Sequence, residues 1–461
     1  MNDQDPAPAV EHAEVVVVGG GTAGLQAALQ LAKTGRSVVV LERRPQGKSG
    51  ARWCNGTVPW HFERAGLDAP KPPELRAAGG AAHMVSPTGA HRFTIDPSPI
   101  DEVDMRALVE RLRSDALAAG VDLRWEVTDV RLSLVRGRPR AVSATVAGEA
   151  VRFTTSLVVD AAGLSGVVRS QVPALAAACP AAVASDLCSA QQLVVAITDQ
   201  DGARRFLEEH EAEPGDAVIT VGVAGGYSTV NINVDESLDE VAILTGSLPA
   251  GGHATGPDLL KAVRDEHPWM GRTLFGGGGL IPLRRIYDQF TAPGIALVGD
   301  AACQVMPGHG SGIGFGLIAG KVLAEAVENA RDPGDADVLW RYQAAYLREF
   351  GAILAGYDAI RRMSVRLGRD GVEELFASGI FSPALVLPGL EQKLGMLSPA
   401  ETVAAVRTLG ARPHLARIVV PALAAMVTSR MLYASYPRTR SDSALRAWSA
   451  AVRRLLPHQD R

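Results

Sequence analysis

The sequence has few cysteines, few aromatic residues and no long uninterrupted apolar run. The spacing of its four cysteines matches neither a disulfide framework nor a zinc site; they are Cys54, Cys179, Cys188 and Cys303. No apolar run reaches the roughly 18 residues of a membrane span. The nearest, 418–431, is interrupted by Pro421 and Arg430 and predicts a core or surface helix. Residues 1–14 lack a charged and then apolar leader, so the cytoplasm is the expected location.

A strong excess of either charge is also absent. The chain has 46 Lys and Arg against 50 Asp and Glu, so the totals do not favour nucleic acid or another polyanion as partner. Only 437–461 is biased, with six arginines against Asp442 and Asp460. A solvated helix face is the simpler interpretation, and contact with anionic lipid stays open beside it. Hydrophobic residues make up 47% of the 461, enough for a large core in two or three domains.

The start of the chain has the pattern of a strand, a helix and a second strand. Residues 1–13 are polar and rich in Pro and Ala and are predicted to be disordered. The apolar run at 14–18 is typical of a buried parallel strand. A helix is expected at 22–33, ended by Gly35, and a second buried strand at 37–41.

A Gly-x-Gly-x-x-Gly motif connects the first strand to the helix. It comprises Gly19, Gly21, Thr22, Ala23 and Gly24. The first glycine allows the tight turn, the second lets the backbone approach a pyrophosphate, and the third lets the helix pack closely. The helix N-terminus supplies unpaired N–H groups. Glu42, at the end of the second strand, can accept hydrogen bonds from both ribose hydroxyls and disfavours NADP, and Arg43 is a further candidate contact. The motif predicts a dinucleotide site without separating FAD from NAD.

A second glycine-rich segment, 294–320, favours FAD. It reads as a strand ending at Gly299-Asp300, a loop containing Pro307, and a helix start at Gly312, Ile313 and Gly314. Asp300 can accept hydrogen bonds from ribityl hydroxyls. The N–H groups at the helix start can face the pyrimidine edge of the isoalloxazine ring, where negative charge gathers on reduction. Large side chains would block the ring, which explains the glycines.

The remaining pattern predicts an α/β fold with a discontinuous Rossmann-type FAD-binding domain, an antiparallel-sheet substrate domain and a helical C-terminal region. A helix is expected from Met105 towards Gly120, followed by an extended stretch at 121–125. Buried strands are expected at 157–161 and 295–298, and antiparallel strands at 193–198, 217–223, 227–234 and 241–244. The predicted FAD-binding segments are 14–48, 100–175 and 280–335, the substrate segments are 49–99 and 176–279, and the helical region is 336–461, interrupted around 382–388 and near Pro413.

These motifs resemble the geranylgeranyl-reductase-related branch of the FAD-dependent oxidoreductases, which have the para-hydroxybenzoate-hydroxylase type of fold and are related to FAD monooxygenases and halogenases. The resemblance is carried by 19–42, by Asp104-Met105-Arg106, by a middle motif at 158–169 and by 276–285. It implies that Arg106 holds the pyrophosphate or adenosine portion of FAD. It also implies that Asp300 and the loop at Pro307 line the ribityl chain and the ring. Val130 and Gly163 complete the predicted cofactor-binding set.

The chain departs from these relatives in three places. The hydroxylases carry an Asp-Gly pair in the middle motif, where this chain has Ala162 before Gly163, and this weakens the hydroxylase interpretation. The Trp-x-Trp-x-Ile-Pro segment of halogenases is absent from the sequence, which disfavours halogenation. The Tyr-x-Trp-x-Phe-Pro substrate motif of prenyl reductases is also missing, with 226–231 in the comparable place, which argues against a long prenyl chain as substrate.

Three residues are candidates for the chemistry. Cys54 lies in a Cys-x-Gly sequence that resembles the loop reaching the flavin in the reductase branch. A thiol there can protonate a carbanion, and a small buried hydrophobe is the competing interpretation. His309, in the glycine loop, can act as an acid near the ring or face solvent. Tyr227 can line the substrate cavity or simply occupy a strand, and Cys303 is most simply a packed residue.

The expected function is hydride transfer between reduced flavin and a C=C bond of an apolar small molecule, such as a secondary metabolite, or the reverse dehydrogenation. An FAD monooxygenase and a flavin electron-relay protein are the alternatives, separated by oxygen consumption and by absence of turnover. The sequence has no second Gly-x-Gly-x-x-Gly motif, so electrons are expected from transiently docked NAD(P)H or from a flavin reductase partner. No metal site is expected, and substrate identity and oligomeric state stay open.

Overall fold

A computed structural model describes residues 9–395 and 397–456. Its nucleotide-side sheet has six strands in the order β19-β20-β13-β2-β3-β9, all parallel except β19. The bounds are β2 Val15–Val18, β3 Val38–Leu41, β9 Asp122–Arg124, β13 Leu157–Asp160, β19 Thr291–Ala292 and β20 Ile295–Leu297. Strands β2, β3, β13 and β20 are buried at every residue. Their unbroken apolar runs therefore reflect a sheet covered on both faces, and the four predicted strands are confirmed.

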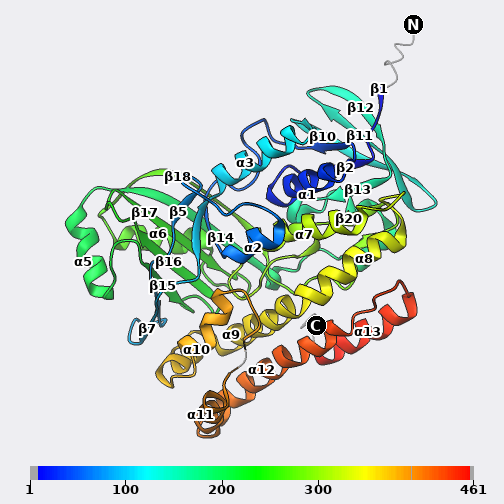
Figure 1. The fold of residues 1–461 in the computed structure, drawn as a ribbon. Helices are drawn as coiled ribbons and strands as arrows, with labels where there is room; N and C mark the ends of the chain where they lie inside the picture. Colours follow the sequence, from blue (N-terminus) through cyan, green and yellow to red (C-terminus); the bar gives the residue numbers. More distant parts are fainter. Residues whose placement is uncertain (1–8, 396, 457–461) are drawn as a thin grey trace.

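Three helices pack together over this sheet: α1 (Thr22–Lys33), α3 (Met105–Ala118) and α7 (Ile313–Val327) (Figure 1). Helix α1 has the predicted bounds, and Gly35 follows its end with φ 84°. Helices α1 and α7 approach so closely that a Cβ on Gly320 would lie 2.7 Å from the Ala27 nitrogen. The two helices that begin at glycine-rich loops therefore lie side by side.

A smaller sheet corrects one prediction. It has the order β1-β12-β11-β10, with bounds β1 Ala9–His12, β10 Val127–Val135, β11 Arg138–Val146 and β12 Glu149–Thr154. Strand β1 runs parallel to β12, with Val10 opposite Arg152. The prediction of disorder for 1–13 is therefore wrong for 9–12, because this polar segment satisfies its backbone groups on a sheet edge. Residues 1–8 lie outside the described residues.

The second large sheet has the order β18-β14-β17-β16-β15-β6-β7 and occupies the left of Figure 1. Its bounds are β6 Ala82–Val85, β7 Arg92–Ile95, β14 Leu187–Ile197, β15 Ala217–Val221, β16 Ser228–Val234, β17 Glu240–Ser247 and β18 Met270–Pro282. The four predicted antiparallel strands are confirmed as β14 to β17. Strand β6 joins from much earlier in the chain and pairs parallel with β15. Helices α5 (Gln200–His210) and α6 (Gly256–Glu266) contribute Phe206 and Leu260 to its apolar core.

A three-stranded sheet and several short helices complete this half of the chain. The sheet has the order β4-β8-β5, with bounds β4 Cys54–Thr57, β5 Leu75–Ala77 and β8 Asp101–Asp104. The short helices are α2 Pro59–Ala65, α4 Pro173–Ala178, η1 Gly163–Ser165, η2 Arg169–Gln171, η3 Ala184–Asp186 and η4 Gly299–Ala302. Strand β8 leads directly into α3, and β4 into α2.

Helices make up the rest of the described chain. They are α8 Ala336–Tyr346, a π-helical turn η5 Leu347–Gly351, α9 Ala352–Ala377, α10 Pro383–Leu390, α11 Pro399–Gly410, α12 Pro413–Ala434 and α13 Asp442–Leu455. The interruption expected around 382–388 lies slightly earlier, at 378–382 between α9 and α10, and Pro388 stands inside α10. The interruption expected near Pro413 is confirmed, because α11 ends at Gly410 and α12 begins at Pro413. A proline in the first turn is compatible with a helix, and Pro383 and Pro413 each begin one.

A buried ion-pair network ties α9 to the second sheet. The Arg361 guanidinium lies 3.0 Å from the Asp186 carboxylate, just before β14, and 2.8 Å from Asp358 on its own helix. The side chains of Arg361 and Asp186 are each 2% exposed. Breaking one partner would leave a buried uncompensated charge, so the network fixes the position of α9 against the sheet.

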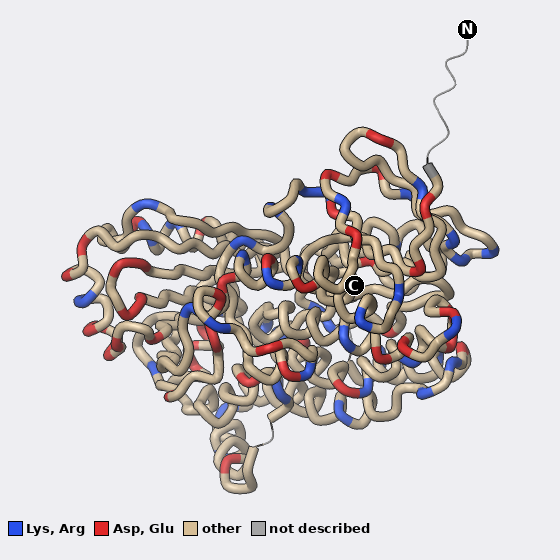
Figure 2. Tube along the Cα trace, turned by 45° about the horizontal axis from the view of Figure 1, so that its top comes forward, with Lys and Arg blue, Asp and Glu red and all other residues tan. Residues whose placement is uncertain are grey.

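Within the described residues, one helix is long and apolar enough to cross a membrane by length and composition. This helix is α12, and 28% of its most apolar stretch is buried. It packs along α9 (Figure 1). The core or surface helix predicted at 418–431 is therefore a surface helix. Figure 2 shows acidic and basic residues interspersed over most of the described chain.

Candidate flavin site

The start of α1 has the tight backbone packing that the motif requires. A Cβ on Gly19, whose φ is 110°, would lie 2.4 Å from the Ala161 carbonyl oxygen. A Cβ on Gly24 would lie 1.9 Å from the Gly19 carbonyl oxygen. Gly21 is open by contrast, with its nearest neighbour at 4.0 Å, and no side chain caps the helix. Thr22 and Ala23 follow as the first helical residues. The free N–H groups and the open Gly21 together leave room for a pyrophosphate.

Glu42 is buried at the end of β3, where its carboxylate accepts hydrogen bonds from the backbone nitrogens of Gly20 (2.6 Å) and Arg44 (2.8 Å). The sequence predicts that this carboxylate binds ribose. The structure adds that it also holds the glycine loop to the second strand. Arg43 is exposed beside it.

The second glycine-rich segment lies against the first. After β20 the chain enters η4 and a loop before α7. Cβ atoms on Gly299 and Gly316 would come within 2.9 Å and 3.1 Å of the Ala23 Cβ, so both residues pack on the first turn of α1. The two glycine-rich segments, which are distant in sequence, therefore lie against each other at the start of α1.

Asp300 lies on this shared surface with no protein partner for its carboxylate among the hydrogen bonds of the described residues. Burial raises its pKa to about 6. Gly312 approaches it so closely that a Cβ there would lie 3.3 Å from Asp300 Oδ1. A half-buried carboxylate without partners fits a ligand that brings hydroxyl donors.

The loop between Pro307 and Ile313 is held by three segments that are remote in sequence. The Tyr227 hydroxyl donates to the Pro307 carbonyl oxygen at 3.0 Å. The His309 ring nitrogen Nε2 lies 3.2 Å from the Gly389 carbonyl oxygen at the end of α10. The Ser311 hydroxyl donates to the Gly56 carbonyl oxygen on β4, at 3.4 Å. Tyr227 therefore positions the loop, a role that the sequence did not suggest.

His309 is exposed on the loop before α7, and desolvation by the surrounding protein lowers the pKa of its ring. Its contact with the Gly389 carbonyl oxygen leaves its predicted part in the chemistry a prediction.

Cys54 lies on β4 next to this loop. Burial raises the pKa of its thiol, and the nearby Glu102 carboxylate raises it further. Glu102 is opposite Gly56 in the β4–β8 register, which places it diagonally across from Cys54 on the same face. The Cys54 nitrogen donates to Gln192 Oε1 at 3.0 Å. The thiol consequently keeps its proton at neutral pH, which disfavours nucleophilic attack and leaves it a weak acid.

The other predicted residues lie at the edges of this region. The Arg106 guanidinium donates to both oxygens of Asp104 and lies 3.4 Å from the centre of the Phe275 ring. The Val130 carbonyl oxygen accepts from Gln171 Nε2 at 3.0 Å. Gly163 begins η1 with φ 69°. Cys303 is buried, as predicted. These contacts leave the predicted roles of Arg106, Val130 and Gly163 as predictions.

Two residues in this region were missed by sequence reasoning. The buried Asp160 carboxylate accepts from the backbone nitrogens of Ala162, Val168 and Arg169, which shapes the loop that Gly19 packs against. An acid at the end of a buried strand was a usable signal for this role. His61 gave no such signal: it is fully buried with both ring nitrogens unpartnered, and burial lowers its pKa to about 3.

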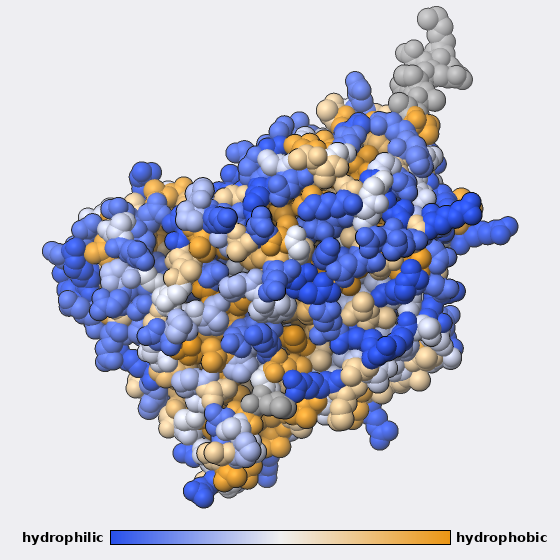
Figure 3. All heavy atoms as spheres, viewed as in Figure 1, coloured by the Kyte–Doolittle hydropathy of each residue, from blue (hydrophilic) through white to orange (hydrophobic). Residues whose placement is uncertain are grey.

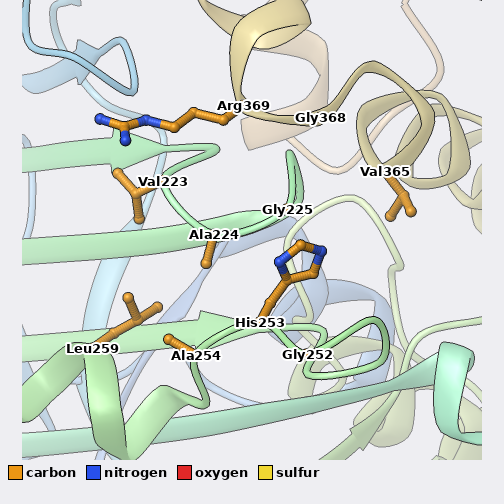
Figure 4. Close-up of a pocket in the computed structure, with 10 residues that line it drawn as sticks. All are labelled: Val223, Ala224, Gly225, Gly252, His253, Ala254, Leu259, Val365, Gly368 and Arg369. Carbon is orange, nitrogen blue, oxygen red and sulfur yellow. The ribbon is translucent and has the colours of Figure 1, made fainter.

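A separate cavity of about 500 Å³ lies between the β15–β16 turn, the loop at 252–254 and α9 (Figure 4). His253 packs against the turn at Gly225 on one side, and Arg369 projects from α9 on another. The lining includes none of the predicted flavin residues. The cavity therefore does not mark the dinucleotide site.

The residues present fit FAD in particular. Open glycine backbone at the start of α1, a carboxylate at the end of β3, and the unpartnered Asp300 beside the start of α7 offer groups for the pyrophosphate, a ribose and the ribityl chain. A dinucleotide that ended in nicotinamide would leave the second glycine-rich segment without a role.

Comparison with known proteins agrees with this fit. A family described as FAD dependent oxidoreductase matches residues 14–81. The digeranylgeranylglycerophospholipid reductase of Sulfolobus acidocaldarius is 26% identical over 468 residues, covering 96% of this chain and 97% of that protein. A solved geranylgeranyl bacteriochlorophyll reductase-like protein of Thermoplasma acidophilum has a TM-score of 0.70 at 17% identity, covering 90% of this chain and 100% of that one. A myxobacterial chondrochloren halogenase has a TM-score of 0.59 at 15% identity, covering 94% and 99%.

The two solved structures show the fold, which flavin-dependent enzymes with different reactions share. The full-length match to a reductase and the family match at the first glycine motif confirm the resemblance and the α/β fold class. The chain is similar to FAD-dependent oxidoreductases at its first glycine motif, and to a digeranylgeranylglycerophospholipid reductase over nearly its whole length.

Proposed function

We propose that this chain uses FAD to reduce a C=C bond in an apolar isoprenoid, or to catalyse the reverse dehydrogenation. The observation that carries the proposal is the protonated, buried Cys54 beside a flavin loop, in a chain that matches a named prenyl-lipid reductase from end to end. Reduction of a C=C bond needs a proton as well as a hydride, and a thiol that stays protonated at neutral pH can supply it.

Each predicted residue has a distinct part in this proposal. FAD, when bound, supplies the hydride. Gly21, Glu42 and Asp300 bind its pyrophosphate and hydroxyl groups. Cys54 holds the proton at Sγ, and Glu102 keeps it there by raising the thiol pKa. Tyr227 holds the Pro307 loop in place, and His309, on the same loop, contacts the substrate or the ring.

The electron donor and the substrate length form the less constrained part of the proposal. We propose NAD(P)H that docks transiently, or a flavin reductase, as the donor. The substrate class comes from the relatives' names, while the missing Tyr-x-Trp-x-Phe-Pro motif favours an isoprenoid that is bound differently from theirs.

The test is anaerobic. FAD-loaded protein is reduced with dithionite and mixed with geranylgeranyl diphosphate, geranylgeraniol or a shorter isoprenoid, and flavin reoxidation and product mass are followed. A reductase gives oxidised flavin and a product heavier by one hydrogen pair per saturated bond. An oxygenated product with rapid oxygen consumption in air identifies a monooxygenase instead. Absence of turnover with every substrate, combined with electron transfer to a dye, identifies a relay protein.

Replacing the thiol tests the proton donor. Cys54→Ala is expected to lower turnover by about a hundredfold while flavin content stays normal, because general acid catalysis typically contributes at least that much. Cys179→Ser is the matched control, since that thiol is also buried but donates to the Gln289 carbonyl oxygen. Normal turnover in Cys54→Ala removes Cys54 from the chemistry.

A further inference from the structure

Helices α11 and α12 present an unusually apolar outer surface. Five of the fourteen exposed large hydrophobic residues in the described chain lie on these two helices: Val403, Val406, Val420, Val427 and Met431, each between 49% and 68% exposed. On the inner side, Leu409, Leu415 and Val419 form one core with α9. Each helix therefore has a buried apolar face and a second, exposed apolar face. We call the exposed one the α11–α12 face.

On α12 this face forms a stripe. Val420, Ala424, Val427 and Met431 recur at helical spacing and lie on one side of the helix, over roughly 16 Å at 1.5 Å per residue. Figure 3 shows hydrophobic residues gathered at the lower end of the molecule, where Figure 1 places α11 and α12. An exposed apolar stripe of this length is typical of a surface that binds a partner.

The Asp, Glu, Lys and Arg residues of the chain segment that carries the stripe are all of one sign. From 402 to 441 the sequence has six arginines and no Asp or Glu. Arg417 and Arg430 are exposed near the two ends of the stripe, and neither has an ion pair in the part of the chain that the structure describes. Arg412 is different, because it pairs with Glu374 on α9. The stripe is therefore bordered by cations that are available to an anionic partner.

The same helical region reaches the flavin loop. Helix α10 contains no charged residue, and its Gly389 carbonyl oxygen lies 3.2 Å from His309 Nε2. The Trp60 indole nitrogen donates to the Glu391 carbonyl oxygen just beyond α10. An apolar segment thus connects the surface near α11 to the predicted site.

We propose that the α11–α12 face docks on the surface of a membrane that contains anionic phospholipid. The apolar stripe enters the interface between headgroups and acyl chains, while Arg417 and Arg430 contact lipid phosphates. The helix lies in the plane of the membrane and does not cross it, because its other face is packed on α9. The docking provides a route by which an isoprenoid in the membrane reaches α10. This role of the docking rests on the proposed function.

Charge favours this partner over a second copy of the chain. A two-fold contact through the stripe would place the arginines of one copy next to those of the other, with no acid between 402 and 441 to offset them. An anionic membrane satisfies the apolar stripe and the arginines at once.

Vesicle flotation of the full-length, FAD-loaded chain tests the proposal. The probes are vesicles of phosphatidylcholine alone and of an equal mixture with phosphatidylglycerol. Wild type is expected to bind the mixed vesicles at least about tenfold more tightly, and added salt should weaken this binding. Val427→Asp with Met431→Asp is expected to reduce binding to the mixed vesicles by about tenfold or more. Arg417→Glu with Arg430→Glu should remove the preference for phosphatidylglycerol.

The matched control is Leu117→Asp with Val135→Asp, two exposed apolar residues on α3 and β10. This variant should bind like wild type. Flavin content and thermal unfolding verify that each variant is folded, and the arginine pair provides the test if the aspartates disturb α12. Binding that is absent in wild type, or equal in all variants, overturns the proposal.

Sedimentation tests the competing partner. A wild-type dimer that Val427→Asp with Met431→Asp converts to monomer overturns membrane docking in favour of self-association. Flotation does not require turnover, and a short soluble isoprenoid should react equally with wild type and the aspartate variant. Failure of docking and failure of the proposed reductase function are therefore distinguishable.

Discussion

The two glycine-rich helix starts look alike in sequence and are built differently. At α1 the glycines pack against backbone: Gly24 on the Gly19 carbonyl oxygen, and Gly19 on the Ala161 carbonyl oxygen. At α7 they pack against side chains from elsewhere, with Gly314 against the His61 ring and Gly308 against the Tyr357 ring. The start of α1 follows from a local rule of backbone packing. The start of α7 depends on side chains that the tertiary structure brings to it.

This difference indicates how much substitution each of the two helix starts tolerates. Backbone cannot move aside without unravelling a strand or helix, whereas a side chain can change rotamer or be replaced. We therefore expect substitutions at α1 to be severe and without remedy, and those at α7 to be milder and open to rescue by a second change.

Gly24→Ala should have the largest effect. Its Cβ would lie 1.9 Å from the Gly19 carbonyl oxygen, so the motif must open, which should cost about 3 kcal/mol of stability and abolish FAD retention. Flavin absorbance relative to protein and thermal unfolding measure both effects. Gly410→Ala is the control, since nothing lies within 4 Å of that position. Normal FAD content in Gly24→Ala would show that the backbone contact is not what the motif requires.

Gly314→Ala should be rescued by a second substitution. The added Cβ would lie 1.8 Å from His61 Nδ1, so the single variant should lose stability and flavin. Removing the ring in the Gly314→Ala, His61→Ala double variant should recover about 2 kcal/mol relative to additive behaviour. Thermal unfolding of the wild type, the two single variants and the double variant measures this coupling. Strictly additive effects would mean that α7 does not depend on His61, and the contrast with α1 would fail.

Asp300→Asn should change the pH dependence of the FAD-free protein. The carboxyl has a pKa raised to about 6 from 3.8, so the folded state binds its proton more tightly than the unfolded state does. Wild-type stability should therefore fall as pH rises through this window, and the variant should gain on the order of 2 kcal/mol over wild type between about pH 4 and pH 7. Urea unfolding at several pH values measures the difference. Asp201→Asn, an exposed carboxylate, is the control. Parallel pH curves for wild type and Asp300→Asn would contradict the burial of that charge.

Tyr227→Phe should have the smallest effect. Losing the hydrogen bond to the Pro307 carbonyl oxygen should cost about 1 kcal/mol and loosen the flavin loop, so turnover should fall about fivefold with FAD content unchanged. Tyr287→Phe removes a similar bond, to the Pro180 carbonyl oxygen away from the loop, and serves as the control. Equal turnover in the two variants would remove the positioning role of Tyr227.

The predictions from sequence succeeded where chemistry and contact are close along the chain. Helix 22–33 and the two buried strands beside it follow from a motif of fewer than thirty residues, in which the backbone rules are local. The role of Glu42 in that motif stays a prediction. The prediction for 1–13 was wrong at 9–12 because a polar segment became a strand only by pairing with β12, more than a hundred residues away. The break expected around 382–388 lies at 378–382 instead, because Pro383 begins α10 and Pro388 stands inside it.

The sequence by itself determined the strand-helix-strand unit from which FAD binding is predicted, because glycine spacing, buried strands and a terminal acid act through neighbouring backbone. Only the tertiary structure decided what surrounds the predicted flavin site. His61, Glu102, Gln192 and the end of α10 reach the flavin region from separate elements. A side chain's neighbours across the fold depend on packing between distant segments, and no local pattern records that packing.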